Sequence, residues 1–134
     1  MVDNLPSAEK KGIIHLIDDD SDIVSIATKA LQNSGYSVHG FSSTGEALED
    51  IEGQCRQSVS LLITDIRMAV HSGIEVAKRT RAIVPDVPVI FLTGFEMHES
   101  EFAKIFPTLE GKNVFVQKPV SIDKLTQTVK QLTG

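Results

Sequence analysis

Three short apolar stretches of the chain are each followed at once by a charged side chain, and this pattern restricts the fold more than any other feature. Apolar stretches of this length are typical of strands buried on both faces of a parallel sheet. In an open parallel α/β sheet, ligands bind beyond the carboxyl ends of the strands. We therefore expect these charges to converge at one edge. The stretches and the charges that follow them are 13–17 with Asp18-Asp19-Asp20, 59–64 with Asp65, and 114–117 with Lys118.

Helical periodicity separates the apolar stretches, so strand and helix alternate along the chain. Such alternation predicts an α/β fold, a parallel sheet with helices on both faces. Right-handed crossovers permit only a few strand orders. Among these we predict the flavodoxin-like, doubly wound (βα)5 order 2-1-3-4-5. The second strand is more polar than the others and suits an edge. The predicted strands are 13–17, 36–41, 59–66, 87–93 and 114–117.

Capping and stop residues place five helices after these strands. The expected boundaries are Asp20 or Ser21 to Gly35, Ser43 or Thr44 to near Gly53, Gly73 to before Pro85, a distorted helix within 95–111 that Pro107 interrupts, and a last helix after Ser121. Asp20 and Asp22 are expected to cap the first helix, where its dipole favours negative charge.

Length and composition are consistent with a single globular domain. The chain has 134 residues, of which 41% are hydrophobic and 23% charged. We expect residues 1–11 to form a polar lead-in and residues 12–134 to form the domain. The net charge of −5 disfavours direct nucleic-acid binding. A single cysteine, Cys55, excludes an intrachain disulfide, and no stretch is apolar enough for a signal peptide or membrane span. We expect a cytoplasmic protein without membrane contact.

The acids at the expected sheet edge are suited to a magnesium ion. Mg²⁺ prefers oxygen ligands and usually takes one or two carboxylates together with water and phosphate oxygens. Asp18 or Asp19 would share the ion with Asp65 from the neighbouring strand. Without a cation these clustered carboxylates would repel one another.

The same edge carries the groups that a phosphoryl transfer needs. Asp65 is the best candidate nucleophile, because a carboxylate can form an aspartyl-phosphate. Lys118 can place its ammonium on a phosphoryl oxygen. Thr93, at the end of the fourth strand, can donate a hydroxyl hydrogen bond to another. Only the joint placement of the three residues is specific, since each alone is common at a strand end.

These motifs resemble the response regulator receiver domain of two-component signalling. The matching segments are HLIDDDSDI, LLITDIRMAVHSGIEV, VPVIFLTG and FVQKPV, and the resemblance covers about residues 12–133. It implies that Asp65 accepts a phosphoryl group from a sensor histidine kinase or a histidine phosphotransfer protein. It also implies that Asp18 and Asp19 hold Mg²⁺ together with Asp65 and the main-chain carbonyl of Arg67.

The resemblance further implies a switch. Thr93 matches the family's switch hydroxyl, Phe115 its switch aromatic, and Lys118 its phosphate-binding lysine. The Lys118–Pro119 bond is expected to be cis. The face formed by the fourth helix, fifth strand and fifth helix would signal to an unknown output protein or fused effector. No turnover of a separate substrate is expected.

The chain departs from the family pattern at several positions. Ala69 stands where a proline is usual, which would loosen the loop 68–72. About three extra residues separate Thr93 from Lys118. Arg67 and Phe95 would flank the phosphoryl group, and we expect them to slow its hydrolysis by hindering the attacking water.

Two other functions agree with part of the pattern. One is an interaction module with the receiver fold that is never phosphorylated. The other is a magnesium-dependent phosphatase of the haloacid dehalogenase type, which would use Asp18 and Asp20; Asp22 stands where that family has threonine or valine. The four histidines share no ligand spacing, so none is interpreted as a metal ligand. The short end after the last helix suits either a stand-alone regulator or a fragment of a larger one.

Overall fold

The computed structural model describes residues 12–53, 58–66, 72–94 and 111–133. From residue 13 to residue 93 the chain alternates between strands and helices as predicted. The elements are β1 (Ile13–Ile17), α2 (Ser21–Asn33), β2 (Ser37–Phe41), α3 (Thr44–Glu52), β3 (Val59–Asp65), α4 (Gly73–Ile83), β4 (Val89–Thr93), β5 (Asn113–Gln117) and α6 (Ile122–Thr133). The expected lead-in 1–11 and almost all of the expected helix within 95–111 lie outside the described residues.

The sheet has the predicted order, β2-β1-β3-β4-β5, and all four neighbouring pairs are parallel. The more polar strand β2 forms one edge, as expected. The fourth strand begins at Val89 rather than at residue 87, because Val87 donates its N–H to the Val84 carbonyl in a turn and Pro88 has no N–H to donate.

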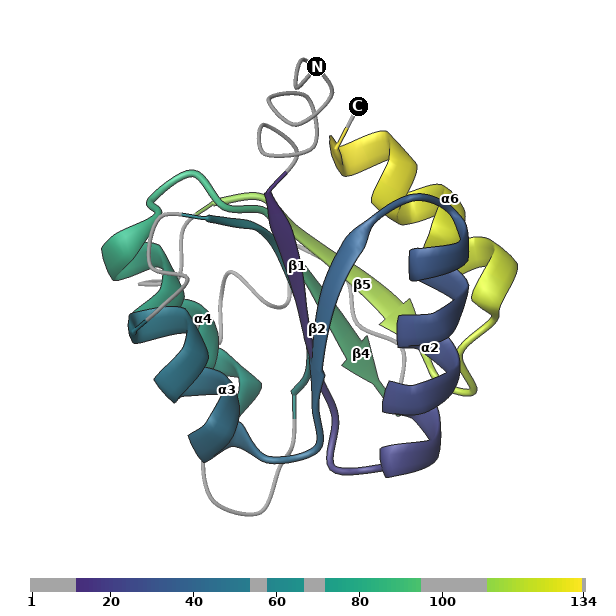
Figure 1. Cartoon of the computed structure of the whole chain (residues 1–134), viewed down its shortest axis with the longest axis horizontal. Coiled ribbons are helices and arrows are strands. Elements are labelled where there is room, and N and C mark those ends of the chain that lie inside the picture. Colours follow the sequence, from purple (N-terminus) through teal and green to yellow (C-terminus); the bar gives the residue numbers. More distant parts are fainter. Residues whose placement is uncertain (1–11, 54–57, 67–71, 95–110, 134) are drawn as a thin grey trace, which may run out of the picture.

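Helices cover both faces of the sheet: α2 and α6 lie on one side, and α3 and α4 on the other (Figure 1). Each side has its own apolar cluster. Leu16, Ile63 and Leu92 belong to the cluster under α2 and α6, whereas Ile17 and Phe91 belong to the cluster under α3 and α4. All five are completely buried. Burial of a side chain of this size contributes about 1.5–3 kcal/mol, so the two clusters hold the strand ends in place.

Side-chain caps begin the helices where the sequence predicts them. The Asp20 carboxylate accepts hydrogen bonds from the N–H groups of Asp22 at 3.0 Å and Ile23 at 3.4 Å. Ser43 caps α3 and Ser72 caps α4 in the same manner. The cap begins α2 directly after Asp18 and Asp19, so the chain turns at these residues as it leaves β1.

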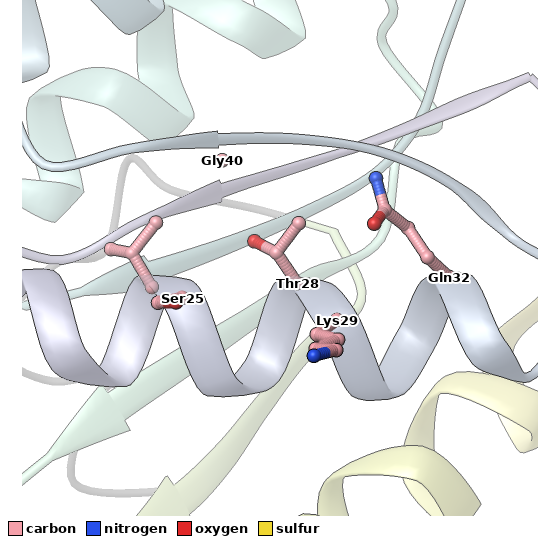
Figure 2. A pocket seen from close by; sticks show the side chains of 6 residues that line it. Ser25, Thr28, Lys29, Gln32 and Gly40 are labelled. Atoms are coloured by element: carbon pink, nitrogen blue, oxygen red, sulfur yellow. The ribbon is translucent and has the colours of Figure 1, made fainter.

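A shallow pocket lies between α2 and the edge strand β2 (Figure 2). Thr28 points from the helix toward Gly40 of the strand. A Cβ at position 40 would collide with the Thr28 hydroxyl and with a Val24 methyl group, so glycine allows the close packing of helix on strand. None of the expected site residues lines this pocket.

No helix among the described residues is long and apolar enough to cross a membrane.

Gly73 lies where α4 starts against the end of β3. Its N–H donates to the Ile66 carbonyl at 2.9 Å. A Cβ at this position would collide with the main-chain carbonyl of Asp65. Glycine at position 73 therefore allows the helix to begin directly beside the end of β3.

We predict that Gly73→Ala lowers the free energy of unfolding by about 2 kcal/mol or more, because the new methyl group meets backbone atoms. Gly45→Ala is the matched control. Position 45 lies in α3 with only ordinary contact for a Cβ, so this variant should keep or raise stability by up to about 1 kcal/mol. Urea unfolding of both variants measures the difference, and equal stabilities would contradict the prediction.

Candidate functional site

The carboxyl ends of β1, β3 and β5 bring three charged side chains together, as the sequence predicts. Asp18 follows β1, Asp65 is the last residue of β3, and Lys118 follows β5. The ammonium nitrogen of Lys118 lies 3.0 Å from Asp18 Oδ2 and 3.0 Å from Asp65 Oδ2. Only the contact with Asp65 has hydrogen-bond geometry. One cation thus bridges two carboxylates that come from different strands.

Asp18 is the most buried of these acids, with no exposed surface. Its Oδ1 accepts a hydrogen bond from the Asp20 N–H at 2.9 Å. Burial raises the pKa of Asp18 above its usual range, against the opposing effects of this N–H and of Lys118. Among the described residues, Oδ2 has no hydrogen-bond partner despite its ion pair. This buried oxygen therefore has no hydrogen bond to offset its burial, and a metal ion could bind it in addition to the contact with Lys118.

Asp19 completes a group of three acids. One carboxylate oxygen each from Asp18, Asp19 and Asp65 lies within 4.8 Å of the others. Asp18 and Asp65 are buried, whereas Asp19 is exposed. Three oxygen ligands with one side open to solvent match the preference of Mg²⁺ for carboxylates and retained water. The residues present therefore fit a magnesium ion.

Two neighbouring strand ends hold Lys118 in place. Its backbone N–H donates to the Thr93 carbonyl at 2.7 Å, and the Lys118–Pro119 peptide bond is cis, as the sequence predicts. Burial alone would lower the pKa of Lys118, but its contacts with the negatively charged Asp18 and Asp65 together raise it. The side chain therefore stays charged at neutral pH.

Thr93 and Phe115, the two residues of the expected switch, lie on the neighbouring strands β4 and β5. Thr93 is the last residue of β4, and it is buried. Phe115 lies two residues earlier in the register of the adjacent strand, opposite Phe91. The two phenyl rings stack with centroids 5.6 Å apart, and Phe115 is partly buried against the core. The aromatic position is thus physically connected to the end of β4.

Three sequence predictions lie outside the described residues. They concern the Arg67 carbonyl as a metal ligand, Arg67 and Phe95 as modulators of hydrolysis, and the effect of Ala69 on its loop.

The second acid of the phosphatase interpretation, Asp20, has a different role in this structure. Asp20 would have to act at the reaction centre, but its carboxylate caps α2 through two backbone N–H groups. Asp20 is also exposed, whereas Asp18 is completely buried. The acid pair at the site is therefore not the one that such an enzyme would use.

The sequence interpretation missed one cluster of ligand-type side chains. His15, His39 and Asp50 each place a ligand atom within 4.8 Å of the others, although the spacing of the histidines in the sequence gave no sign of this group. The positions of the two histidines in their strands could have indicated this group. Each histidine occupies the centre of a five-residue strand, and the two strands are parallel neighbours.

Comparisons with known proteins agree with the geometry. The family model described as "Response regulator receiver domain" matches residues 14–130. The chain is 32% identical over 117 residues to the sensor kinase CckA of Brucella abortus, covering 87% of this chain and 12% of CckA. It is 40% identical over 82 residues to the response regulator receiver protein CpdR of the same organism, covering 61% of this chain and 66% of CpdR.

Solved structures show the same similarity in three dimensions. A response regulator receiver domain protein from Clostridium thermocellum is 30% identical with a TM-score of 0.75, and the match covers 91% of this chain and 94% of that one. The receiver domain of the hybrid histidine kinase CckA is 28% identical with a TM-score of 0.75, over 92% of this chain and all of that one (100%).

The chain spans only part of several relatives: 12% of CckA and 24% of the C4-dicarboxylate transport transcriptional regulatory protein DctD of Rhizobium meliloti. Its match to the family model, by contrast, extends over nearly all of its own length. Together with the strand order and the acidic edge of the sheet, this match shows that the chain belongs to the response regulator receiver domain family of two-component systems.

Proposed function

We propose that this receiver domain accepts a phosphoryl group on Asp65 with the help of Mg²⁺ held by Asp18, Asp19 and Asp65. The observation that carries the proposal is the position of Lys118, whose ammonium lies 3.0 Å from a carboxylate oxygen of both Asp18 and Asp65. A cation fixed beside the candidate nucleophile can stabilise the charge of an arriving phosphoryl group.

The proposed covalent step transfers the phosphoryl group from a nitrogen to an oxygen. A carboxylate oxygen of Asp65 attacks the phosphorus of a phosphohistidine, the new P–O bond forms, and the P–N bond breaks. The leaving imidazole keeps the bonding electron pair and takes up a proton. Bound magnesium supplies positive charge to the phosphoryl oxygens. Lys118 transfers its hydrogen bond from Asp65 to one of these oxygens, and the Thr93 hydroxyl donates to another.

The proposed donor is a sensor histidine kinase or a histidine phosphotransfer protein. The relatives include a sensor kinase, CckA, and a transcriptional regulatory protein, DctD, so receiver domains of this kind occur in both contexts. The output of this chain, whether a separate protein or a fused effector, would respond to Thr93 and Phe115. A cytoplasmic location is part of the same proposal.

We predict that beryllofluoride, which mimics an aspartyl-phosphate, binds the wild-type domain only when Mg²⁺ is present. Two-dimensional NMR should then show shifts at Thr93, Phe115 and Lys118. Asp65→Asn should abolish these shifts while retaining the fold. If the wild-type spectrum shows no magnesium-dependent change, the domain is a receiver-shaped interaction module rather than a phosphoacceptor.

We also predict that Asp18→Asn raises the unfolding temperature in EDTA by a few degrees, roughly, and removes the further rise caused by Mg²⁺. The reason is that the folded state raises the pKa of Asp18 above its unfolded value. The free energy of unfolding therefore falls as the pH rises from the unfolded-state pKa of Asp18 to its folded-state pKa. An asparagine amide at position 18 does not titrate and so avoids this loss.

Asp22→Asn is the matched control, since it removes the same charge from an exposed position in the first turn of α2. Its response to Mg²⁺ should equal that of the wild type. Calorimetry with and without Mg²⁺ makes the comparison. An Asp18→Asn variant that Mg²⁺ still stabilises fully would contradict the assignment of Asp18 as a ligand.

Slow hydrolysis of the aspartyl-phosphate is a further part of the proposal. Arg67 and Phe95 lie two residues after Asp65 and Thr93 in the sequence, where bulky side chains would hinder an in-line water. We predict that Arg67→Ala shortens the half-life of the phosphorylated domain severalfold, measured by intact mass after removal of the phosphodonor. A wild-type half-life of seconds would contradict this part alone.

A further inference from the structure

A second group of ligand-type side chains lies between the first two strands and α3, apart from the phosphoacceptor site. His15 of β1 and His39 of β2 are paired directly in the parallel register. Asp50 approaches both from α3. Its Oδ2 lies 2.8 Å from His15 Nε2 and 2.7 Å from His39 Nδ1. Three separate elements, β1, β2 and α3, thus bring two nitrogens and one oxygen to within 4.8 Å of one another.

The surroundings of His15 favour the uncharged ring that binds metals. The side chain is completely buried, and its ring stacks on Phe41 with centroids 6.2 Å apart and planes 8° apart. Burial lowers the pKa of His15, although Asp50 acts in the opposite direction. Nδ1 is a buried nitrogen with no hydrogen-bond partner among the described residues. The stack on Phe41 and the contact with Asp50 place the ring with Nε2 toward Asp50.

The spacing of the three ligand atoms is compatible with a shared metal ion. Bonds from a metal to imidazole nitrogen or carboxylate oxygen are about 2.0–2.2 Å long. In the tetrahedral geometry that Zn²⁺ prefers, two such ligands are separated by about 3.4 Å. The two histidine nitrogens lie 2.8 and 2.7 Å from Asp50 Oδ2, which are hydrogen-bond distances. A bound ion would replace these hydrogen bonds, and the ligand atoms would move apart by about 0.6 Å to admit it.

We propose that His15, His39 and Asp50 form a binding site for a borderline divalent transition-metal ion, with Zn²⁺ as its typical occupant. Imidazole nitrogens suit zinc, nickel, cobalt and copper, whereas Mg²⁺ takes oxygen ligands. The two groups of ligand-type side chains in this domain therefore differ in the metal they select. Water completes the coordination, because three protein ligands leave further positions open.

An ion would enter the site from the side of the edge strand β2. The His39 side chain is 41% exposed and that of Asp50 is 19% exposed, whereas His15 is fully enclosed. An ion can thus reach the two outer ligands and then the buried one. A bound ion would link the edge strand β2 and helix α3 to the more central strand β1. It would stabilise the folded state in proportion to its occupancy.

The test is a titration of the full chain with Zn²⁺ by isothermal calorimetry, in a non-chelating buffer that contains excess Mg²⁺. One zinc ion per chain should bind, and thermal unfolding should shift upward by about 5–10 °C at zinc concentrations near 100 times the dissociation constant. His39→Gln and Asp50→Asn should each weaken zinc binding about tenfold or more. His39→Gln is the safer variant, because the side chain is partly exposed on an edge strand.

Two control variants locate the ion. Glu49→Gln removes a neighbouring charge from an exposed position of α3 and should leave zinc binding unchanged. Asp65→Asn removes an acid of the phosphoacceptor site and should also leave it unchanged. Circular dichroism and Mg²⁺ binding check that His39→Gln is folded. A cobalt titration adds a direct signature, since visible absorption bands should appear in the wild type and be lost in His39→Gln.

Three results would overturn the proposal. The first is no saturable zinc binding by the wild-type chain. The second is undiminished binding by folded His39→Gln. The third is loss of the zinc site in Asp65→Asn, which would place the ion among the acids of the phosphoacceptor site. The proposal is independent of phosphorylation, so a domain that never binds beryllofluoride would still test it.

Discussion

The ion pair of Lys118 with Asp18 and Asp65 is the interaction on which the rest of the site depends. Asp18 is completely buried and Asp65 nearly so, and two carboxylates this close destabilise the fold unless a cation lies between them. The ammonium can reach both only because β1, β3 and β5 end at the same edge of the sheet. The strand order is therefore a requirement of the chemistry, since Asp65 and Lys118 are 53 residues apart in the chain and meet only because their strands end at the same edge.

This ion pair also suggests how occupancy of the site would reach a distant surface. The Lys118 N–H is bonded to the Thr93 carbonyl, and the register of the same two strands places Phe115 opposite Phe91. A phosphoryl group on Asp65 would compete for the ammonium and for the Thr93 hydroxyl. In the proposed switch, a movement of the end of β4 would alter the stack of Phe91 on Phe115. Phe91 is completely buried, whereas Phe115 is partly exposed. Transmission of this kind requires two packing arrangements of similar energy, because a well-packed core does not deform continuously.

Sequence reasoning identified the sheet order and the charged edge because both depend on patterns that are local in the chain. An apolar stretch followed by a charge marks the end of a buried strand, and Asp18, Asp65 and Lys118 were all found in this way. The start of β4 was misplaced because Val87 is buried and apolar but forms a turn before Pro88. The pair of His15 and His39 was missed because it depends on strand register, and its third member comes from a helix.

The two clusters of ligand-type side chains differ in a way that follows from their positions on β1. His15 lies three residues before Asp18, which is about 10 Å along a strand. His15 lies within the strand, beneath α3, where an imidazole can be stacked and buried without charge. Asp18 lies beyond its end, where its carboxylate is grouped with those of Asp65 and the exposed Asp19. A strand interior thus suits nitrogen ligands with a borderline metal, whereas the open edge suits oxygen ligands with magnesium. The same strand would therefore serve both proposed metals, since Mg²⁺ takes oxygen ligands and is a poor match for the histidine pair.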